Sequence, residues 1–461
     1  MKELPFTPLM TISLILTIGI IIAKWGYDDF NMCFWLIILL ISFTVACSIS
    51  FLIKRCHQIA SSDKKQRLLN CAQCVMIHLC ILSLGAFLTC RQITDSPNAT
   101  QLKTQQQLSW LTQAKITTEQ TKHNIESKLA SLRLEQQDYA VIAAMALGDK
   151  RALDSNTRNS YSISGASHIL AVSGLHVGII FQLFFFLLGG RKHSFSTIAL
   201  SLISIWAYVF LIGLPASAVR AAIMLTAYSI SLIFCRTNLS FSALAAAYIF
   251  MLFLSPLYLF ELGFQLSFLA VASILLFFNP LYSLFTLRSR IIRWAWGLLS
   301  VSLAAQIGTL PVIIYIFGRI SCYSLLTNYI AIPSATLILY LGALLILLTP
   351  LALFTPVSPV VTPLISLASR ALGSITQFLN TAIEMISILP GASIENVSIS
   401  LPLVIGLYAI ILLIYALLRR VDKLLKFRKF CPTRPERSFC PFFCYSFFLI
   451  SSHVSLFSMF R

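Results

Sequence analysis

Two histidines flank a serine–glycine step at the start of a long apolar run. His168 and His176 enclose Ser173 and Gly174, and Gly178 follows four positions after Gly174. A glycine loosens a helix and exposes its backbone, and two glycines at this spacing let two helices approach closely. Ionisable side chains at membrane depth are costly, so they mark a pathway or a buried pair. Two interpretations remain open here: the entrance of a membrane pathway, or packing glycines beside two interfacial histidines.

The composition excludes a soluble globular protein. Hydrophobic residues make up 58% of the 461 residues and charged residues only 11%. Long continuous apolar runs predict helices that satisfy their own backbone hydrogen bonds within the membrane. The formal net charge is +18, which fits basic cytoplasmic loops as well as a carrier of polyanions. Charge alone does not choose between the two.

The apolar runs predict an all-α polytopic membrane protein with about 10 or 11 transmembrane or re-entrant helices and additional amphipathic interfacial helices. The basic loop at 54–67 is assigned to the cytoplasm, which sets the direction of the other spans. The expected spans are Leu9–Ala23, Met32–Ile53, Ala72–Thr89, Ile179–Leu188, Phe195–Gly213, Pro215–Phe234, Phe241–Phe260, Leu262–Phe278, Gly297–Phe317, Ala335–Leu353 and Leu401–Leu418.

The chain divides into five regions by composition. Residues 1–90 hold N-terminal transmembrane helices, 91–139 an extracytoplasmic amphipathic segment, 140–355 the transmembrane core, 356–418 an amphipathic helix and the last transmembrane helix, and 419–461 a basic and then hydrophobic tail. In the second region, Ile116, Ile125, Leu129 and Leu132 recur at helical spacing and predict one amphipathic helix.

After Phe317, hydrophobicity and charge predict different topologies. Leu325–Ile332 is too short to span and ends at Pro333, which predicts a re-entrant segment. Leu364–Leu389 mixes apolar and polar residues and is expected to lie along the membrane surface. The positive charge of the tail predicts that it lies in the cytoplasm. The number of predicted membrane crossings places it on the opposite side. One segment in this part is therefore miscounted.

Polar residues gather in four clusters within the apolar core. They could line a hydrated cavity, with Gly and Pro breaks exposing irregular backbone to water. Alternatively, these residues have only a structural role. Arg220 and Glu261 would then form a buried ion pair, and the amide side chains would form hydrogen bonds between helices. The candidate pathway residues are His168, Ser173, His176, Arg220, Glu261, Gln265, Gln306, Arg319 and Asn328.

No sequence motif for an enzyme, a cofactor or a metal is found. The chain contains neither a phosphate-binding G-x-x-x-x-G-K-[ST] loop nor a metallohydrolase motif. Cys71 and Cys74 form a single C-x-x-C without a second pair nearby. His168, Ser173 and Glu261 could be drawn as a protease-like set, but no triad motif surrounds them. We therefore expect no enzyme, no cofactor and no bound metal.

Taken together and in order, the four clusters resemble the ComEC family of competence proteins. The similarity covers about residues 140–335, and residues 1–90 fit the N-terminal spans of the family loosely. The segments that carry it are His168–Gly178, Gly213–Ala221, Ser255–Phe268, Ala305–Pro311, Phe317–Gly318 and Asn328–Pro333.

The resemblance implies a multi-pass channel component of the bacterial inner membrane that takes up single-stranded DNA during natural transformation. Larger family members also have an outer OB-like domain and a C-terminal metallo-β-lactamase-like domain. Here 91–139 is too short for an OB fold, and no β-lactamase-like metal motif is present. The resemblance thus implies separate partners: an extracytoplasmic DNA receptor, a nuclease and a cytoplasmic ATPase or helicase, with membrane lipid around the chain. A truncated copy and a homo-oligomer are left open.

Two other functions compete with this expectation. A secondary transporter of a small organic solute would also use broken helices and intramembrane polar groups. A membrane scaffold that recruits a DNA-processing complex would use its tail and not its polar core.

Overall fold

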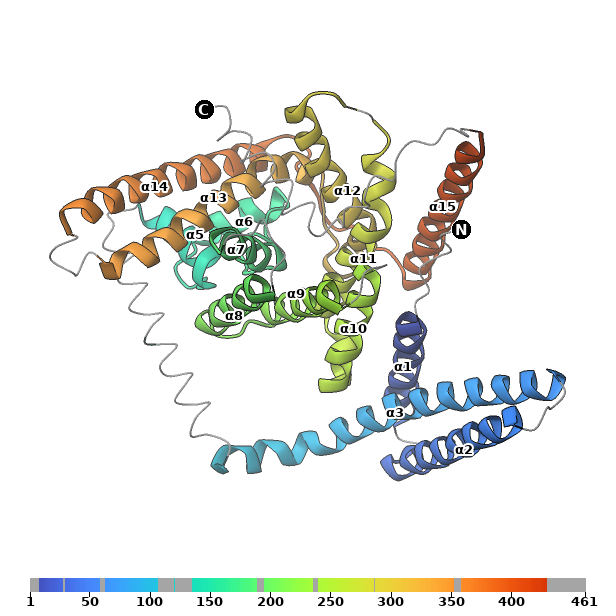
Figure 1. The fold of residues 1–461 in the computed structure, drawn as a ribbon. Coiled ribbons are helices and arrows are strands. Elements are labelled where there is room, and N and C mark those ends of the chain that lie inside the picture. The colour runs from blue at the N-terminus through green and yellow to red at the C-terminus, as the bar shows by residue number, and fades with distance from the viewer. Residues whose placement is uncertain are drawn as a thin grey trace. The chain divides into compact units, whose positions relative to one another are not determined.

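The computed structural model describes residues 8–27, 30–58, 63–106, 120, 135–188, 195–234, 239–285, 287–351 and 358–428. These residues are almost entirely helical, with two short strands, so the all-α prediction is confirmed (Figure 1). Within them, six helical segments are long and apolar enough to cross a membrane. These segments are Pro8–Trp25, Met32–Ile53, Gln66–Thr94, Leu262–Tyr282, Arg290–Phe317 and Ser324–Leu345.

Four shorter apolar helices add to these spans. They are Gly174–Leu187, Phe195–Leu211, Ser240–Leu254 and Leu401–Leu417. A helix rises 1.5 Å per residue, so helices of this length are shorter than the hydrocarbon core of a bilayer. They can cross it only if the flanking residues extend the apolar segment. The chain is thus a multi-pass membrane protein, and it separates into two compact units.

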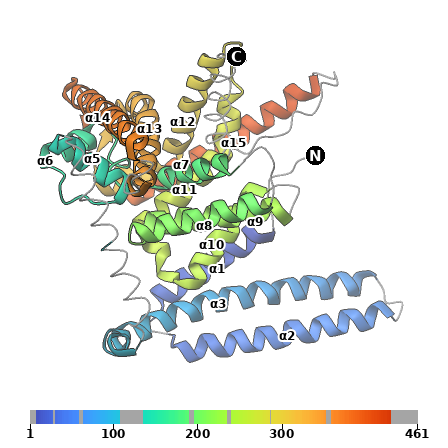
Figure 2. The ribbon, with the colours of Figure 1, turned by 60° about the vertical axis from the view of Figure 1, so that its left-hand side comes forward.

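The first unit comprises residues 1–113 and 227–265. Its elements are α1 (Pro8–Trp25), α2 (Met32–Gln58), α3 (Asp63–Gln106), α10 (Leu239–Leu254) and η1 (Pro256–Phe260). The long helix α3 packs against both α1 and α2, and α2 lies beside it in Figure 2. Close packing of α1 on α3 depends on Gly19, where an added Cβ atom would clash with the carbonyl oxygen of Leu82.

The second unit comprises residues 114–226 and 266–461. Its helices are α5 (Gln136–Leu147), α6 (Ser155–Ile163), α7 (Gly174–Leu187), α8 (Phe195–Leu211), α12 (Arg290–Phe317), α13 (Ser324–Leu351), α14 (Ser358–Ile388) and α15 (Leu401–Arg428). Two further helices, α9 (Ala216–Phe234) and α11 (Leu262–Tyr282), run across the boundary between the units.

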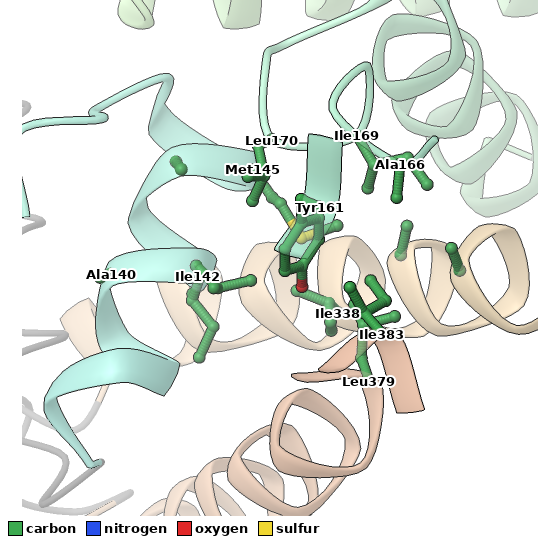
Figure 3. Packing of buried hydrophobic residues seen from close by; sticks show 14 of the residues in the cluster. Ala140, Ile142, Met145, Tyr161, Ala166, Ile169, Leu170, Ile338, Leu379 and Ile383 are labelled. Carbon is green, nitrogen blue, oxygen red and sulfur yellow. The ribbon is translucent and has the colours of Figure 1, made fainter. Parts of the chain in front are cut away.

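Helices α5, α6, α13 and α14 enclose the main hydrophobic core of the second unit (Figure 3). Tyr161 of α6 lies at its centre with 1% of its surface exposed. Met145 of α5, Ile338 of α13 and Leu379 of α14 surround the ring. Close packing of these side chains positions α6 against α5, α13 and α14.

A small antiparallel pair of strands closes one end of this unit. Strand β1 (Ile320–Ser321) joins α12 to α13, and β2 (Ser393–Ile394) lies between α14 and α15. Ile320 pairs with Ile394 and Ser321 with Ser393. Two connections that are far apart in sequence are therefore held side by side.

The predicted re-entrant segment Leu325–Ile332 is wrong. Helix α13 runs without interruption from Ser324 through Pro333 to Leu351, and it includes most of the span expected at 335–353. A proline inside a helix costs about 3 kcal/mol, but α5, α7, α12 and α14 all pack against α13. Packing on several sides compensates for the lost hydrogen bond, which the sequence pattern does not reveal.

Two other boundaries differ from the predictions. Helix α3 continues to Gln106, past the limit expected at residue 90. The run Phe241–Phe260 ends its α-helix at Leu254 and continues as the 3-10 helix η1, with Pro256 at its start. The amphipathic pattern at Ile116–Leu132 and the hydrophobic end of the tail lie outside the described residues.

Candidate functional site

The loop between α6 and α7, residues 164–173, is the non-helical segment around which the polar clusters of the second unit gather. We call it the α6–α7 loop. Its first residues contact the start of α13, and its last residues contact the start of α9. The sequence 168–178, which is rich in Ser, Gly and His, thus begins as a loop and becomes helical at Gly174.

The first end of the loop is fixed by hydroxyl groups of the α12–α13 connection and α13. Thr327 donates from Oγ1 to the Ser164 carbonyl at 2.9 Å, and Ser321 donates from Oγ to the Ile163 carbonyl at 2.7 Å. Gly165 has a φ of +83°, and a Cβ atom there would lie 2.7 Å from the Cβ of Ser324. Only glycine fits both the backbone conformation and the space.

Arg319 and Gln306 lie at this same end. Arg319 donates from Nη1 to Ser162 Oγ at 2.8 Å, and its Nη2 lies 2.6 Å from Glu395 Oε1. Gln306 donates from Nε2 to Ser324 Oγ at 3.0 Å. The structure therefore bonds these two predicted pathway residues to hydroxyl groups at the end of α6 and the start of α13, next to the first end of the loop, and it gives Arg319 a carboxylate partner that the sequence did not indicate.

The second end of the loop caps α7. The backbone N–H of Ser173 donates to Nδ1 of His176 at 3.3 Å, and Ser173 Oγ lies 2.8 Å from the same nitrogen. Ser217 of α9 donates to the Val172 carbonyl at 2.5 Å. A Cβ atom at Gly174 would lie 3.5 Å from the Cβ of Ala221, so the starts of α7 and α9 are in contact.

Gly178 does not follow the packing prediction. A Cβ atom there would meet nothing within 4 Å. At Gly174 the neighbouring helix lies at an ordinary contact distance, and at Gly178 no such contact is found. Four-residue spacing places two glycines on one helix face but does not say how far the neighbouring helix follows that face.

Arg220 is buried one turn into α9, with 7% of its surface exposed. It donates from Nε to Ser267 Oγ of α11 at 3.2 Å. A guanidinium group is always charged and presents five N–H donors in a rigid plane. Arg220 therefore brings a permanent positive charge to the helix that contacts the start of α7.

Glu261 and Gln265 belong to the first unit. Gln265 donates from Nε2 to the Leu259 carbonyl at 3.0 Å, and Glu261 is exposed at the end of η1. Because Arg220 belongs to the second unit, the predicted Arg220–Glu261 pair stays a prediction.

His168 and Asn328 differ in their surroundings. His168 is exposed, and its Nδ1 atom lies 3.2 Å from the Gly165 carbonyl oxygen. Asn328 is buried and donates from Nδ2 to Ser302 Oγ at 3.3 Å. Its Oδ1 atom and the Nε2 atom of His176 are buried polar atoms without a hydrogen-bond partner.

A second polar group in the core was missed by the sequence analysis. Asn380 of α14 donates to Asp138 Oδ1 of α5 at 2.8 Å and accepts from the Tyr161 hydroxyl at 2.8 Å. Asp138 is 5% exposed. Burial raises the pKa of Asp138 above its ordinary 3.8, the nearby Glu135 raises it further, and the hydrogen bond from Asn380 partly offsets both.

This raised pKa predicts a pH-dependent stability. The folded state disfavours ionised Asp138, so its contribution is present below pH 3.8 and is lost as the pH rises through the raised pKa. Asp138→Asn keeps an acceptor for Asn380 and removes the ionisation. We expect the variant to be more stable than the parent chain at neutral pH, because it has no charge to bury at this position.

Thermal unfolding of the detergent-solubilised protein between pH 4 and 8 measures this effect. The Asn variant should lose the pH dependence that the parent chain shows, while Glu384→Gln, at an exposed position on α14, should keep it. Parallel pH profiles for the parent and Asp138→Asn would contradict the assignment.

Among the residues that the structure describes, no group of three or more His, Cys, Asp or Glu side chains is placed to hold a metal ion. Cys74 Sγ of the C-x-x-C lies 3.5 Å from His78 Nδ1 on the same helix. The α6–α7 loop is therefore held in place by hydroxyl groups of α13, of the α12–α13 connection and of α9, each of which donates to a backbone carbonyl at one end of the loop.

Comparison with known proteins gives a consistent result. Residues 145–421 match the family model described as competence protein. ComE operon protein 3 of Bacillus subtilis is 32% identical over 235 residues, which cover 48% of this chain and 29% of that protein. Recombination protein 2 of Haemophilus influenzae is 26% identical over 208 residues, which cover 42% and 26%. The chain thus matches less than a third of the length of either relative. No solved structure matches it.

Proposed function

Because the chain belongs to the competence protein family, we propose that it is a channel component that passes single-stranded DNA through the bacterial inner membrane during transformation. It would act as a conduit and not as an enzyme. The similarity to ComE operon protein 3 and to Recombination protein 2 supports a role in the same process.

The observation that carries this proposal is the meeting of separate polar clusters at the α6–α7 loop. Side chains from the α12–α13 connection and α13 hold one end, and side chains from α9 hold the other. Irregular backbone at membrane depth is tolerated where it is buried in protein or faces water. His176 Nε2 and Asn328 Oδ1 are buried polar atoms without a hydrogen-bond partner, which is rare in folded proteins.

The distribution of positive charge supports DNA as the substrate. A single DNA strand is a flexible polyanion, and a groove that guides it needs cations along its path. Arg220 supplies a buried cation next to the loop, and Arg288, Arg290 and Arg293 are exposed together near the start of α12. We propose that a DNA receptor outside, a nuclease, and an ATPase or helicase inside complete the process.

Uptake by vesicles tests the proposal directly. The purified chain is inserted into liposomes that enclose a single-stranded-DNA-binding protein, which traps any strand that enters. We expect nuclease-protected, fluorescent single-stranded DNA inside these vesicles and no protected duplex DNA. Empty liposomes with the same trap are the control.

Two outcomes would reject the channel. Saturable flux of small organic solutes without protected DNA would indicate a secondary transporter. Absence of both, with transformation lost on tail deletion but unaffected by substitutions at Arg220, would indicate a scaffold.

A further inference from the structure

Arg319 is held between two oxygen atoms from separate parts of the second unit. Its Nη1 atom donates to Ser162 Oγ of α6 at 2.8 Å, and its Nη2 atom lies 2.6 Å from Glu395 Oε1. The pairing of β1 with β2 brings the two charges together, because Arg319 directly precedes β1 and Glu395 directly follows β2. The guanidinium group is therefore positioned by the fold before any ligand binds.

The ion pair between Arg319 and Glu395 is open to solvent. The side chain of Arg319 is 31% exposed, and that of Glu395 is 51% exposed. Exposed ion pairs contribute little to stability, because water and salt screen both charges. The hydroxyl group of Ser162 contacts the other terminal nitrogen and does not depend on the carboxylate. An incoming anion can thus replace Glu395 at small cost while Ser162 keeps the guanidinium group in place.

The guanidinium group suits a phosphodiester as well as a carboxylate. Arginine presents its N–H groups in a rigid plane that matches the oxygen atoms of both anions. A phosphodiester carries one negative charge and two non-bridging oxygens, so it can take the place of the Glu395 side chain. Ser162 lies in the last turn of α6, and the α6–α7 loop begins two residues later. A phosphodiester bound to Arg319 would therefore lie beside the first end of this loop.

We propose that Arg319 binds a phosphodiester group and that Glu395 occupies this site until the phosphodiester displaces it. The inference rests on the proposed function, because the phosphodiester is then one of the translocating DNA strand. Glu395 compensates the charge of Arg319 when no strand is present, and it weakens the contact with a strand that is. Conduction requires sites that bind well enough for entry and weakly enough for release.

Binding of a fluorescent single strand to the full chain in maltoside detergent, which contains no phosphate, tests the inference. Glu395→Gln keeps the size of the side chain and an acceptor for Arg319, but it removes the competing charge. We expect this variant to bind the strand about threefold more tightly than the parent, the value of one exposed ion pair. Glu384→Gln, at an exposed position on α14, is the matched control and should bind as the parent does.

The same substitution in an Arg319→Gln background separates displacement from general repulsion. A carboxylate that only repels DNA weakens binding whether or not Arg319 is present. A carboxylate that competes for the guanidinium group has nothing to compete for once Arg319 is removed. We therefore expect Glu395→Gln to leave the affinity of the Arg319→Gln protein unchanged. Thermal unfolding of each variant shows whether it is folded.

The salt dependence of binding gives a second readout. Each phosphate neutralised on a single strand contributes about 0.7 to the slope of log affinity against log salt. Arg319→Gln should reduce the slope. Glu395→Gln should increase it by at most about 0.7, because no carboxylate is then released to take up a cation. A change that affected only the packing of β1 and β2 would not steepen the slope.

The outcomes separate this inference from the proposed function. Equal affinity of the parent and Glu395→Gln for the strand would overturn the inference and leave the channel function standing. The same gain with and without Arg319 would do so too.

Titration with dimethyl phosphate and with phosphatidylglycerol, read from the guanidinium nitrogen resonances of Arg319, identifies the source of the phosphodiester. A shift with dimethyl phosphate that is larger in Glu395→Gln, without binding of any strand, would keep the site and reject the DNA function. A shift with phosphatidylglycerol alone would assign the site to a lipid headgroup and overturn the DNA assignment. No shift with any probe in either protein would overturn the inference.

Discussion

Arg220→Gln should lower DNA uptake by at least about tenfold while the protein stays at normal levels in the membrane. The guanidinium is buried in α9, beside the contact of α9 with α7, and donates to Ser267. Losing a charge-assisted contact to phosphate removes about 1.5–3 kcal/mol of interaction. Each 1.36 kcal/mol added to a barrier is a tenfold change in rate.

Conservative variants show whether the guanidinium is needed or only its charge. Arg220→Lys keeps the charge but loses the planar fork of donors, so we expect little recovery. Ser267→Ala removes the hydroxyl that holds Nε in place and should cost a smaller factor, because a neutral hydrogen bond contributes about 0.5–1.5 kcal/mol. Arg370→Gln, at an exposed position on α14, is the matched control and should take up DNA normally.

Uptake is measured as nuclease-resistant labelled DNA in a transformable host that lacks its own copy of the protein. Membrane levels of each variant are compared by immunoblotting. Normal uptake by Arg220→Gln at normal protein levels would show that Arg220 has only a packing role.

The spans were predictable because lipid imposes a simple rule on the sequence. A long apolar run has few structures available to it other than a helix, so most helix positions agree with the expected spans. Pro333 is the instructive exception. A local rule ends a helix at proline, but α13 gains enough from packing against its neighbours to continue. Packing between distant segments is not visible in a local pattern.

The polar clusters were predictable as residues but not as contacts. A charged or amide side chain in an apolar run is conspicuous, which is how Arg220, Gln306 and Asn328 were found. Their partners are the serines Ser267, Ser324 and Ser302, and serine is common in membrane helices and carries no such signal. The link between Asp138 and Asn380 joins residues 242 positions apart, and no local spacing could have indicated it.

The glycines show how the structure changes a prediction drawn from spacing. Gly174 and Gly178 attracted attention because they are four residues apart, yet Gly178 has open space around it. Gly165 had no such partner in the sequence, and it lies against Ser321 and Ser324 with a positive φ. Gly165 is therefore the glycine that the loop conformation requires, and this requirement is visible only in the structure.

Gly165→Ala should consequently destabilise the protein by about 2–5 kcal/mol and abolish DNA uptake. The new Cβ atom would lie 2.7 Å from Ser324 Cβ and 2.8 Å from Ser321 Oγ, closer than such atoms approach. The positive φ adds strain, because an L-residue with a side chain rarely adopts it. Relief requires the α6–α7 loop to move away from α13, which would break the hydrogen bond from Thr327 to Ser164.

The matched control is the same substitution at Gly178. There the added methyl group meets nothing within 4 Å, and alanine favours a helix over glycine by about 1 kcal/mol. Gly178→Ala should be as stable as the parent or slightly more stable. Gly165→Asn separates the two causes, because asparagine tolerates a positive φ but needs more space. If strain dominates, Asn is better than Ala at this position; if crowding dominates, it is worse. Equal thermal unfolding of Gly165→Ala and Gly178→Ala would show that the loop is not held against α13 in the working protein.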